Sequence, residues 1–375
     1  MRKAIAVAAR IAVLGLANWT NSSRRFFFCG GHAVDERFAT TRWLMTNRPQ
    51  NAPAASQTPS RTATAAQVIH LRSTNLRGGL FVTLAFALTG ISLFLSTTQS
   101  LTAWLVGQGL LGLAIVQWFV LLHECGHGTL FRTKWLNHYT GHLASFFSVI
   151  PFSCWTRVHA LHHIWTGWQD VDPTTASLVP RELGRIEKFV VNLCWKLWIP
   201  LFSVFYRINN FWNVGRLRIL FPDKNQQRKL AWNIVFLLSA YAGLIVAVGV
   251  REVIHLGGLA LLLGLIFEDP LLLSQHTHIP LRLSQGERVR PFSAIEQEPF
   301  TRSLRFPRWF STAVLLNLDA HELHHMYPYI PGYHLRQIPY TTRNEMHWWR
   351  WLREAKRLPG EVFLFQNRNQ TGLEI

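Results

Sequence analysis

Cysteine is scarce in this chain of 375 residues, and its four cysteines form no C-x-x-C motif. They are Cys29, Cys125, Cys154 and Cys194. Their spacing excludes a zinc knuckle and a cysteine-ligated iron–sulfur cluster. The chain also lacks the H-P-G-G motif of a fused haem domain. We therefore expect any redox chemistry of this chain to draw its electrons from another protein.

Charged residues are also few, at 15% of the chain, whereas soluble domains carry about 25%. Four runs approach the ~20 apolar residues that cross ~30 Å of hydrocarbon. They are residues 79–98, 103–122, 231–250 and 253–274, and Glu268 and Asp269 make the last run the weakest. Because the links within each pair are short, the sequence predicts an all-α integral membrane fold with four transmembrane helices in two hairpins.

Acidic residues are outnumbered, with 20 Asp and Glu against 38 Lys and Arg. The long segments 128–230 and 275–375 are polar and rich in Arg. By the positive-inside rule, these segments and both termini are predicted to be cytoplasmic, where they would form a helical cap. Within this cap, residues 142–155 and 190–206 are predicted to lie along the membrane surface. Basic residues that flank spans without a recognition motif argue against nucleic acid as a partner.

The N-terminal part has a different composition. Residues 1–78 hold eleven Lys and Arg against Asp35 and Glu36, which predicts a poorly ordered basic extension over residues 1–75. Its residues 1–44 are either an artefact of an upstream start site, since Met45 also opens a polar leader, or an Arg-rich transit peptide; we favour the artefact. A membrane domain over residues 76–350 and a C-terminal tail over residues 351–375 would follow.

Histidines are what the chain has in abundance, and eight of its 17 fall in three short motifs. The motifs are HECGH (His123, His127), HALHH (His159, His162, His163) and HELHH (His321, His324, His325). Histidines three or four apart on a helix lie on one face, close enough to bind one metal ion. Adjacent histidines point roughly 100° apart, so each HxxHH can serve two neighbouring metals. The QHTH segment offers one further ligand, either His276, which we favour, or His278.

The predicted topology places all three motifs at the cytoplasmic side. HECGH and HELHH also match H-E-x-x-H, the zinc protease motif in which Glu is a general base. A zinc protease would use one such motif and leave six clustered histidines without a role. A metal site with two ions, for which iron is the leading candidate, accounts for all of them.

The order HECGH, HALHH, QHTHIP, HELHHMYP resembles the membrane fatty acid desaturase family, over about residues 76–337, and is closest to its omega branch. Smaller features that fit are Asn137, Gly141, Trp155, Arg157, Asp170, Asp172 and Asn317. The resemblance implies a cytoplasmic centre of two iron ions held by the eight histidines and His276. It also implies side chains that orient these ligands, for which Glu124, Asp170, Asp172, Asn317, Asp319 and Glu322 are candidates.

The resemblance further implies O2-dependent desaturation of a fatty acyl chain, with Trp118, Phe119 and Trp155 as candidate walls of the substrate channel. Electrons would come from ferredoxin or cytochrome b5, whose acidic surface could dock on Arg282, Arg288, Arg290, Arg302, Arg305 and Arg308. Anionic lipid headgroups are the alternative partner for these arginines. Hydroxylation or ketolation of a lipid or carotenoid by the same kind of centre stays open, as does the acyl carrier, and the zinc protease is a remote alternative.

Overall fold

The structure is a computed structural model that describes Val68 and residues 70–375. The predicted artefact or transit peptide within residues 1–44, and nearly all of the predicted extension, lie outside the described residues. The elements below belong to one compact unit, which contains all described residues except 286–288.

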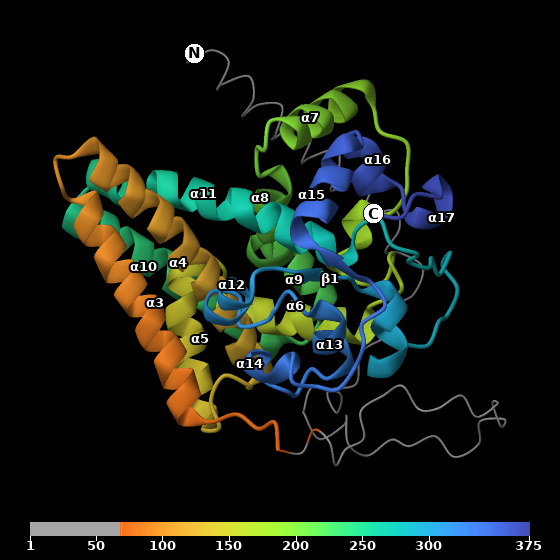
Figure 1. Cartoon of the computed structure of the whole chain (residues 1–375), viewed down its shortest axis with the longest axis horizontal. Helices are drawn as coiled ribbons and strands as arrows, with labels where there is room; N and C mark the ends of the chain where they lie inside the picture. Colours follow the sequence, from red (N-terminus) through yellow and green to blue (C-terminus); the bar gives the residue numbers. More distant parts are fainter. Residues whose placement is uncertain (1–67, 69) are drawn as a thin grey trace. The chain divides into compact units, whose positions relative to one another are not determined.

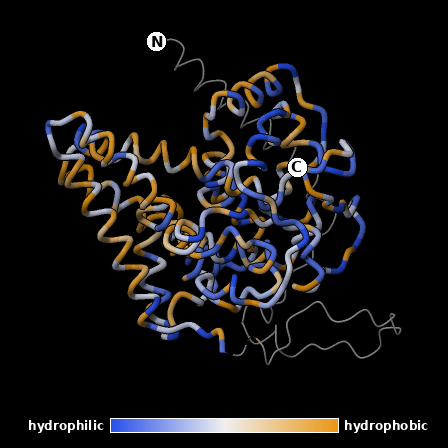
Figure 2. Tube along the Cα trace, viewed as in Figure 1, coloured by the Kyte–Doolittle hydropathy of each residue, from blue (hydrophilic) through white to orange (hydrophobic). Residues whose placement is uncertain are grey.

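Four helices of this unit are long and apolar enough to cross a membrane (Figures 1 and 2). They are α3 (Asn75–Ser96), α4 (Leu101–His127), α10 (Lys224–Val248) and α11 (Val250–His276). Each contains most of one predicted apolar run, so the prediction of a mostly helical protein with four candidate spans is confirmed. The caps follow from the sequence, since Thr74, Ser100 and Asp223 each accept a hydrogen bond from a backbone N–H of the first turn that follows.

The weakest predicted span, α11, continues as a helix through Glu268, Asp269 and Pro270. The two carboxylates are buried because α8 (Leu201–Arg207) supplies their partners. Arg207 forms an ion pair with Glu268, and the backbone N–H of Ser203 donates to Asp269 over 2.5 Å. The acidic residues that interrupt the apolar run therefore join α11 to α8.

The helix α4 lies at the centre of the packing and contacts α3, α5, α6 and α11. A Cβ at Gly112 would lie 3.2 Å from the carbonyl oxygen of Ala260, so glycine permits the close approach of α4 and α11. The letters GQGLLG at 107–112 match G-x-G-x-x-G, but they lie inside α4 and follow no strand, unlike a dinucleotide-binding loop. In this protein two of its glycines, Gly107 and Gly112, serve helix packing, whereas a Cβ at Gly109 would meet nothing within 4 Å.

Shorter elements make up the rest of the unit. Between the two long pairs these are α5 (Lys134–Ser148), α6 (Phe152–Trp165), η3 (Ala176–Leu178), α7 (Arg185–Lys196), α8, η4 (Ile208–Trp212) and α9 (Val214–Leu220). After α11 come η5 (Ala294–Phe300), β1 (Ser303–Arg305), α12 (Arg308–Ala313), α13 (His321–Met326), α14 (Gly332–Leu335), β2 (Glu345–His347), α15 (Trp348–Arg357), α16 (Gly360–Phe365) and α17 (Arg368–Thr371). The strands β1 and β2 pair in parallel, with Leu304 opposite Met346.

The segments predicted to lie along the membrane surface fall on short helices. Residues 142–155 span the end of α5 and the start of α6, and residues 190–206 span parts of α7 and α8. The helical segments 185–196 and 201–212 meet at a bend of 112°. Their position at a membrane surface stays a prediction.

The C-terminal residues 351–375, set apart above as a tail, carry α16, α17 and most of α15. Trp351 and Phe363 are buried, and the ring of Phe363 stacks on Trp195 of α7 with centroids 4.7 Å apart. This end of the chain is therefore packed against the helices that follow HALHH.

Candidate metal centre

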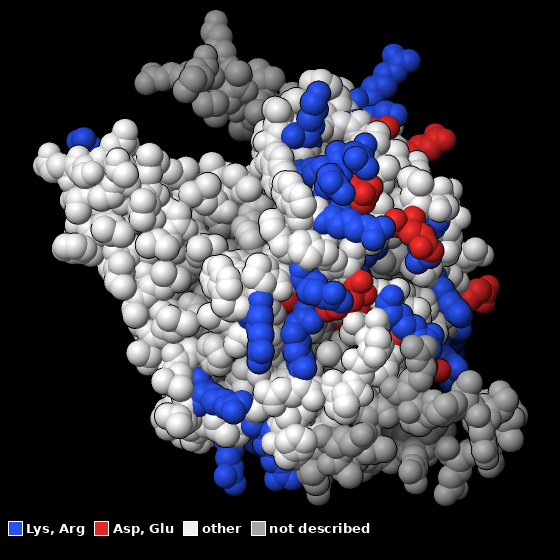
Figure 3. Space-filling view, in the orientation of Figure 1, with Lys and Arg blue, Asp and Glu red and all other residues white. Residues whose placement is uncertain are grey.

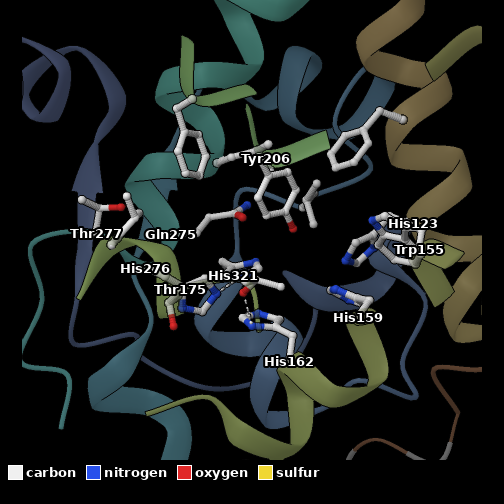
Figure 4. A pocket seen from close by; sticks show the side chains of 16 residues that line it. His123, Trp155, His159, His162, Thr175, Tyr206, Gln275, His276, Thr277 and His321 are labelled. Atoms are coloured by element: carbon white, nitrogen blue, oxygen red, sulfur yellow. Dashed lines mark hydrogen bonds between the residues drawn. The ribbon is translucent and has the colours of Figure 1, made fainter. Parts of the chain in front are cut away.

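The site histidines lie at the ends of four helices. His123 and His127 occupy the last turns of α4, which is followed by Gly128 in the left-handed conformation with φ 70°. HALHH forms the second half of α6, HELHH forms most of α13, and His276 is the last residue of α11. Four chain segments therefore bring their histidines to one place (Figure 4).

Eight histidines form two groups of four, and within each group one ligand atom per residue lies within 4.8 Å of all the others. One group is His123, His127, His159 and His324, and the other is His162, His276, His321 and His325. The ninth, His163, lies beside the first group, with its Nε2 3.0 Å from the Nε2 atoms of both His159 and His324. His324 and His325 thus fall in different groups, and His163 lies beside the group that does not contain His162, as predicted for adjacent residues of a helix. The prediction that histidines three apart share one metal is wrong, because His159/His162 and His321/His324 are divided between the groups, whereas His123/His127 and His321/His325, four apart, stay together.

The nitrogen spacings fit metal ligands. The Nε2 atoms of His127 and His159 are 2.9 Å apart, and those of His276 and His321 are 2.8 Å apart. Two nitrogens bound at right angles to one metal by bonds of about 2.1 Å would lie about 3.0 Å apart. Among the described residues, both ring nitrogens of His123 are buried without a hydrogen-bond partner, a costly arrangement that a metal ion bound to one of them would relieve.

Burial also keeps these imidazoles neutral. Desolvation, followed by the neighbouring histidines, lowers the pKa of His159, His163, His321, His324 and His325 well below the usual value. A neutral imidazole has the free lone pair that a metal requires. The residues present therefore fit two transition-metal ions with imidazole ligands.

The Nδ1 atoms of three site histidines are held by other groups. The Nδ1 of His162 lies 2.7 Å from Asp172 and 2.9 Å from the hydroxyl of Thr174. The Nδ1 of His276 lies 3.1 Å from the carbonyl oxygen of Phe300. The amide oxygen of Gln297 lies 2.8 Å from the Nδ1 of His325. These contacts leave each Nε2 available to the centre.

Asp172 is the predicted orienting residue that the structure brings into hydrogen-bond contact with a site histidine. Burial would raise the pKa of its carboxyl, but the charge and hydrogen bond of His162 and the backbone N–H of Thr174 lower it below the usual value. Gln297 is buried and also donates to the carbonyl oxygen of His163 over 2.7 Å. Nothing in the sequence near Gln297 marked it, whereas Thr174 could have been found from its place two residues after Asp172.

The other predicted orienting residues support the backbone around the site. Glu124 lies 3.4 Å from the Nδ1 of His123 and accepts a hydrogen bond from the backbone N–H of Gly332 over 2.8 Å. Asn317 donates to the carbonyl oxygen of Gly332, and Asp319 pairs with Arg336. Glu322 accepts from the backbone N–H groups of Arg343 and Asn344, and Asp170 accepts from Ser284.

Of the two histidines in QHTH, the structure brings His276 to the centre and places His278 elsewhere. The Nε2 of His278 lies 2.8 Å from the hydroxyl of Thr371, and its Nδ1 lies 3.2 Å from the carbonyl oxygen of Gln366. Arg302, counted above in a basic docking patch, is 4% exposed and donates to the carbonyl oxygens of Ser274 and Thr277. It therefore closes the end of α11 and does not belong to a surface patch.

A cavity of about 40 Å³ adjoins the histidines and has room for at most about three water molecules. Its lining includes Phe119 and Trp155, two of the predicted channel aromatics, together with Phe202, Tyr206 and Gln275. Figure 4 shows the side chains of Tyr206 and Gln275 pointing into this cavity.

Trp155 stacks on a site histidine. Its ring and that of His159 have centroids 4.2 Å apart and planes inclined by 21°. A Cβ at Gly126 would lie 2.2 Å from this indole, so glycine at that position makes room for it. Trp155 thus forms one wall of both the centre and the cavity.

Comparison with known proteins identifies the constellation. The family model described as "Fatty acid desaturase" matches residues 98–351, which contain all nine histidines. The chain belongs to the fatty acid desaturase family. It is therefore an oxidoreductase of the desaturase type, and the zinc protease interpretation loses its basis.

Individual relatives of this desaturase are named as lipid or fatty acid desaturases. An sn-1 oleoyl-lipid 12-desaturase of Picosynechococcus sp. is 26% identical over 255 residues, covering 66% of this chain and 70% of the relative. An omega-3 fatty acid desaturase of the endoplasmic reticulum from Vigna radiata is 26% identical, covering 60% of this chain and 61% of the relative. An sn-2 acyl-lipid omega-3 desaturase (ferredoxin) from Helianthus annuus is 25% identical, covering 58% and 50%. These relatives support the omega-type branch.

Proposed function

We propose that this desaturase introduces a double bond into the acyl chain of a membrane lipid at a centre of two iron ions. The observation that carries the proposal is the pair of four-histidine groups, with His324 in one group and its neighbour His325 in the other. Bound there, two irons would use O2, two electrons and two protons to remove two hydrogens from adjacent methylenes, which yields an alkene and two water molecules.

Residues of this chain would orient the metal ligands and enclose the substrate. Asp172, Gln297 and the carbonyl oxygen of Phe300 would hold three imidazoles in orientation. Phe119, Trp155 and Phe202 would line the space for the reacting methylenes and keep bulk water away. The acyl chain needs more room than the present cavity offers, so we expect that lining side chains such as Phe202 move when it binds.

We further propose that the centre and both termini face the cytoplasm and that the four spans form two hairpins. The contact between α3 and α4, the contact between α10 and α11, and the short links within each pair support the hairpins. The Arg-rich segments 128–230 and 275–375, which carry HALHH and HELHH, support the orientation. Electrons would come from an external carrier, and the relative from Helianthus annuus is named as a ferredoxin-type desaturase.

The test is gas chromatography–mass spectrometry of the lipids of a host that expresses this chain with a ferredoxin and its reductase. We expect a new double bond that is absent with the His325→Ala variant. The position of the bond and the lipid class that carries it identify the substrate. A hydroxylated lipid as the product would show that the enzyme hydroxylates its substrate, and coloured, oxygenated carotenoids would favour the ketolase alternative. An unchanged lipid profile with iron-loaded protein present would contradict the proposal.

A further inference from the structure

A groove of about 280 Å³ lies on the surface beside the HELHH helix, and we call it the α13 groove. Its lining combines Leu323 of α13 and Arg305 of β1 with residues between 336 and 345, among them Arg336 and Glu345. It shares no lining residue with the cavity beside the histidines. The groove is therefore a second, separate feature of the same region.

The α13 groove is only one helix away from the metal ligands. Leu323 lines the groove, and the next two residues of α13, His324 and His325, belong one to each histidine group. The rate of electron transfer falls steeply with distance, so a donor seated in this groove would have a short route to both groups.

The charge around the groove is arranged with the cations outermost. In the ion pair of Arg305 with Glu345, the side chains are 66% and 11% exposed, and in that of Arg343 with Glu298 they are 53% and 12% exposed. Each carboxylate thus lies beneath its arginine. Figure 3 shows Lys and Arg gathered over the region where Figure 1 places β1 and α12. A partner that approaches this face meets guanidinium groups first.

We propose that the α13 groove, with Arg305 in its lining and Arg343 next in the chain to the lining residue Thr342, is the docking face for a small acidic electron-transfer protein. The inference rests on the proposed function, because a desaturase of this kind consumes two electrons from an external carrier in each turnover. Because the guanidinium groups are exposed above their paired carboxylates, they can contact acidic side chains of a partner at close range, and salt weakens this attraction. The proposal assigns docking of the electron donor to the exposed arginines beside this groove. Arg302 is buried and is not one of them.

The test compares the double variant Arg305→Gln, Arg343→Gln with Arg181→Gln. The control also removes a guanidinium from a surface ion pair, with Glu187, away from the groove. The Michaelis constant for reduced [2Fe–2S] ferredoxin is measured at low and at physiological salt, with each protein in lipid nanodiscs. We expect the constant of the double variant to rise about tenfold at low salt and to depend less on salt, whereas the control matches the wild type.

A donor-independent assay separates docking from catalysis. Enzyme reduced with dithionite undergoes a single turnover, and we expect the double variant to form as much double bond as the wild type. If the double variant loses its iron or its fold, Thr342→Glu places a repelling charge in the groove and is expected to raise the same constant.

Two outcomes would overturn the proposal. One is an unchanged Michaelis constant of the double variant for ferredoxin; weaker binding of this variant to anionic vesicles would then assign the arginines to lipid headgroups. The other is a Michaelis constant that rises equally in the Arg181→Gln control. A wild type that forms no double bond even after reduction with dithionite would instead refute the proposed function.

Discussion

Replacing Asp172 by Asn tests how the chain orients its metal ligands. The carboxylate lies 2.7 Å from the Nδ1 of His162, is buried, and is held in turn by the backbone N–H and hydroxyl of Thr174 over 2.8 and 2.9 Å. Asparagine keeps the shape but removes the charge, and charge-assisted hydrogen bonds are about twice as strong as neutral ones. Losing such a partner of a metal-bound histidine costs roughly 10–100-fold in metal affinity or activity.

The assay measures iron retained per chain during dialysis against a chelator, beside product formation by gas chromatography–mass spectrometry. The matched control is Asp170→Asn, since Asp170 binds Ser284 and contacts no site histidine through a hydrogen bond. We expect Asp172→Asn to lose iron and activity together and Asp170→Asn to retain both. An Asp172→Asn protein with wild-type iron retention and rate would refute the reasoning that this carboxylate orients His162.

Three further predictions follow from the contacts. Arg207→Ala leaves Glu268 buried and unpaired, so we expect a loss of about 3–5 kcal/mol in stability, measured by unfolding in detergent; a melting temperature equal to that of the wild type would count against the ion pair. His276→Ala should lose at least about tenfold in iron affinity while His278→Ala keeps its iron, and equal losses from the two variants would remove His276 from the centre. Burial raises the pKa of Glu345, but Arg336 and Arg305 lower it overall below the usual value. Its ion pairs therefore stabilise the fold at pH values above the pKa of this carboxyl in the unfolded chain, and the stabilisation is lost as pH falls through the lowered pKa of the folded protein. Glu345→Gln should therefore lower the free energy of unfolding by about 1 kcal/mol or less at pH 7 and leave it unchanged at low pH. A difference in the free energy of unfolding that stays the same at both pH values would contradict the assignment.

The helices and the histidine groups were accessible from the sequence because both depend on local spacing. Apolar runs of sufficient length predict α3, α4, α10 and α11, and the i, i+4 spacing predicts that His321 and His325 share one group. The i, i+3 pairs do not follow this rule, because His159 and His162 fall in different groups, as do His321 and His324. His276 follows its apolar run directly, which was enough to favour it over His278.

The partners of these groups were not accessible, because they come from distant parts of the chain. Gln297 lies 28 residues before His325, and Arg207 lies 61 residues before Glu268. A carboxylate inside an apolar run gives no sign of whether it ends a span or pairs with another helix. The fold of residues 351–375 likewise depends on long-range packing, here of Phe363 on Trp195.

The most direct test of the central claim is the metal content of the purified protein, determined by mass spectrometry of the metals beside the His325→Ala variant. The two histidine groups predict about two iron atoms per chain and little zinc. We expect fewer iron atoms per chain in the variant. One zinc ion per chain, or iron content that His325→Ala leaves unchanged, would contradict a di-iron centre built from these histidines.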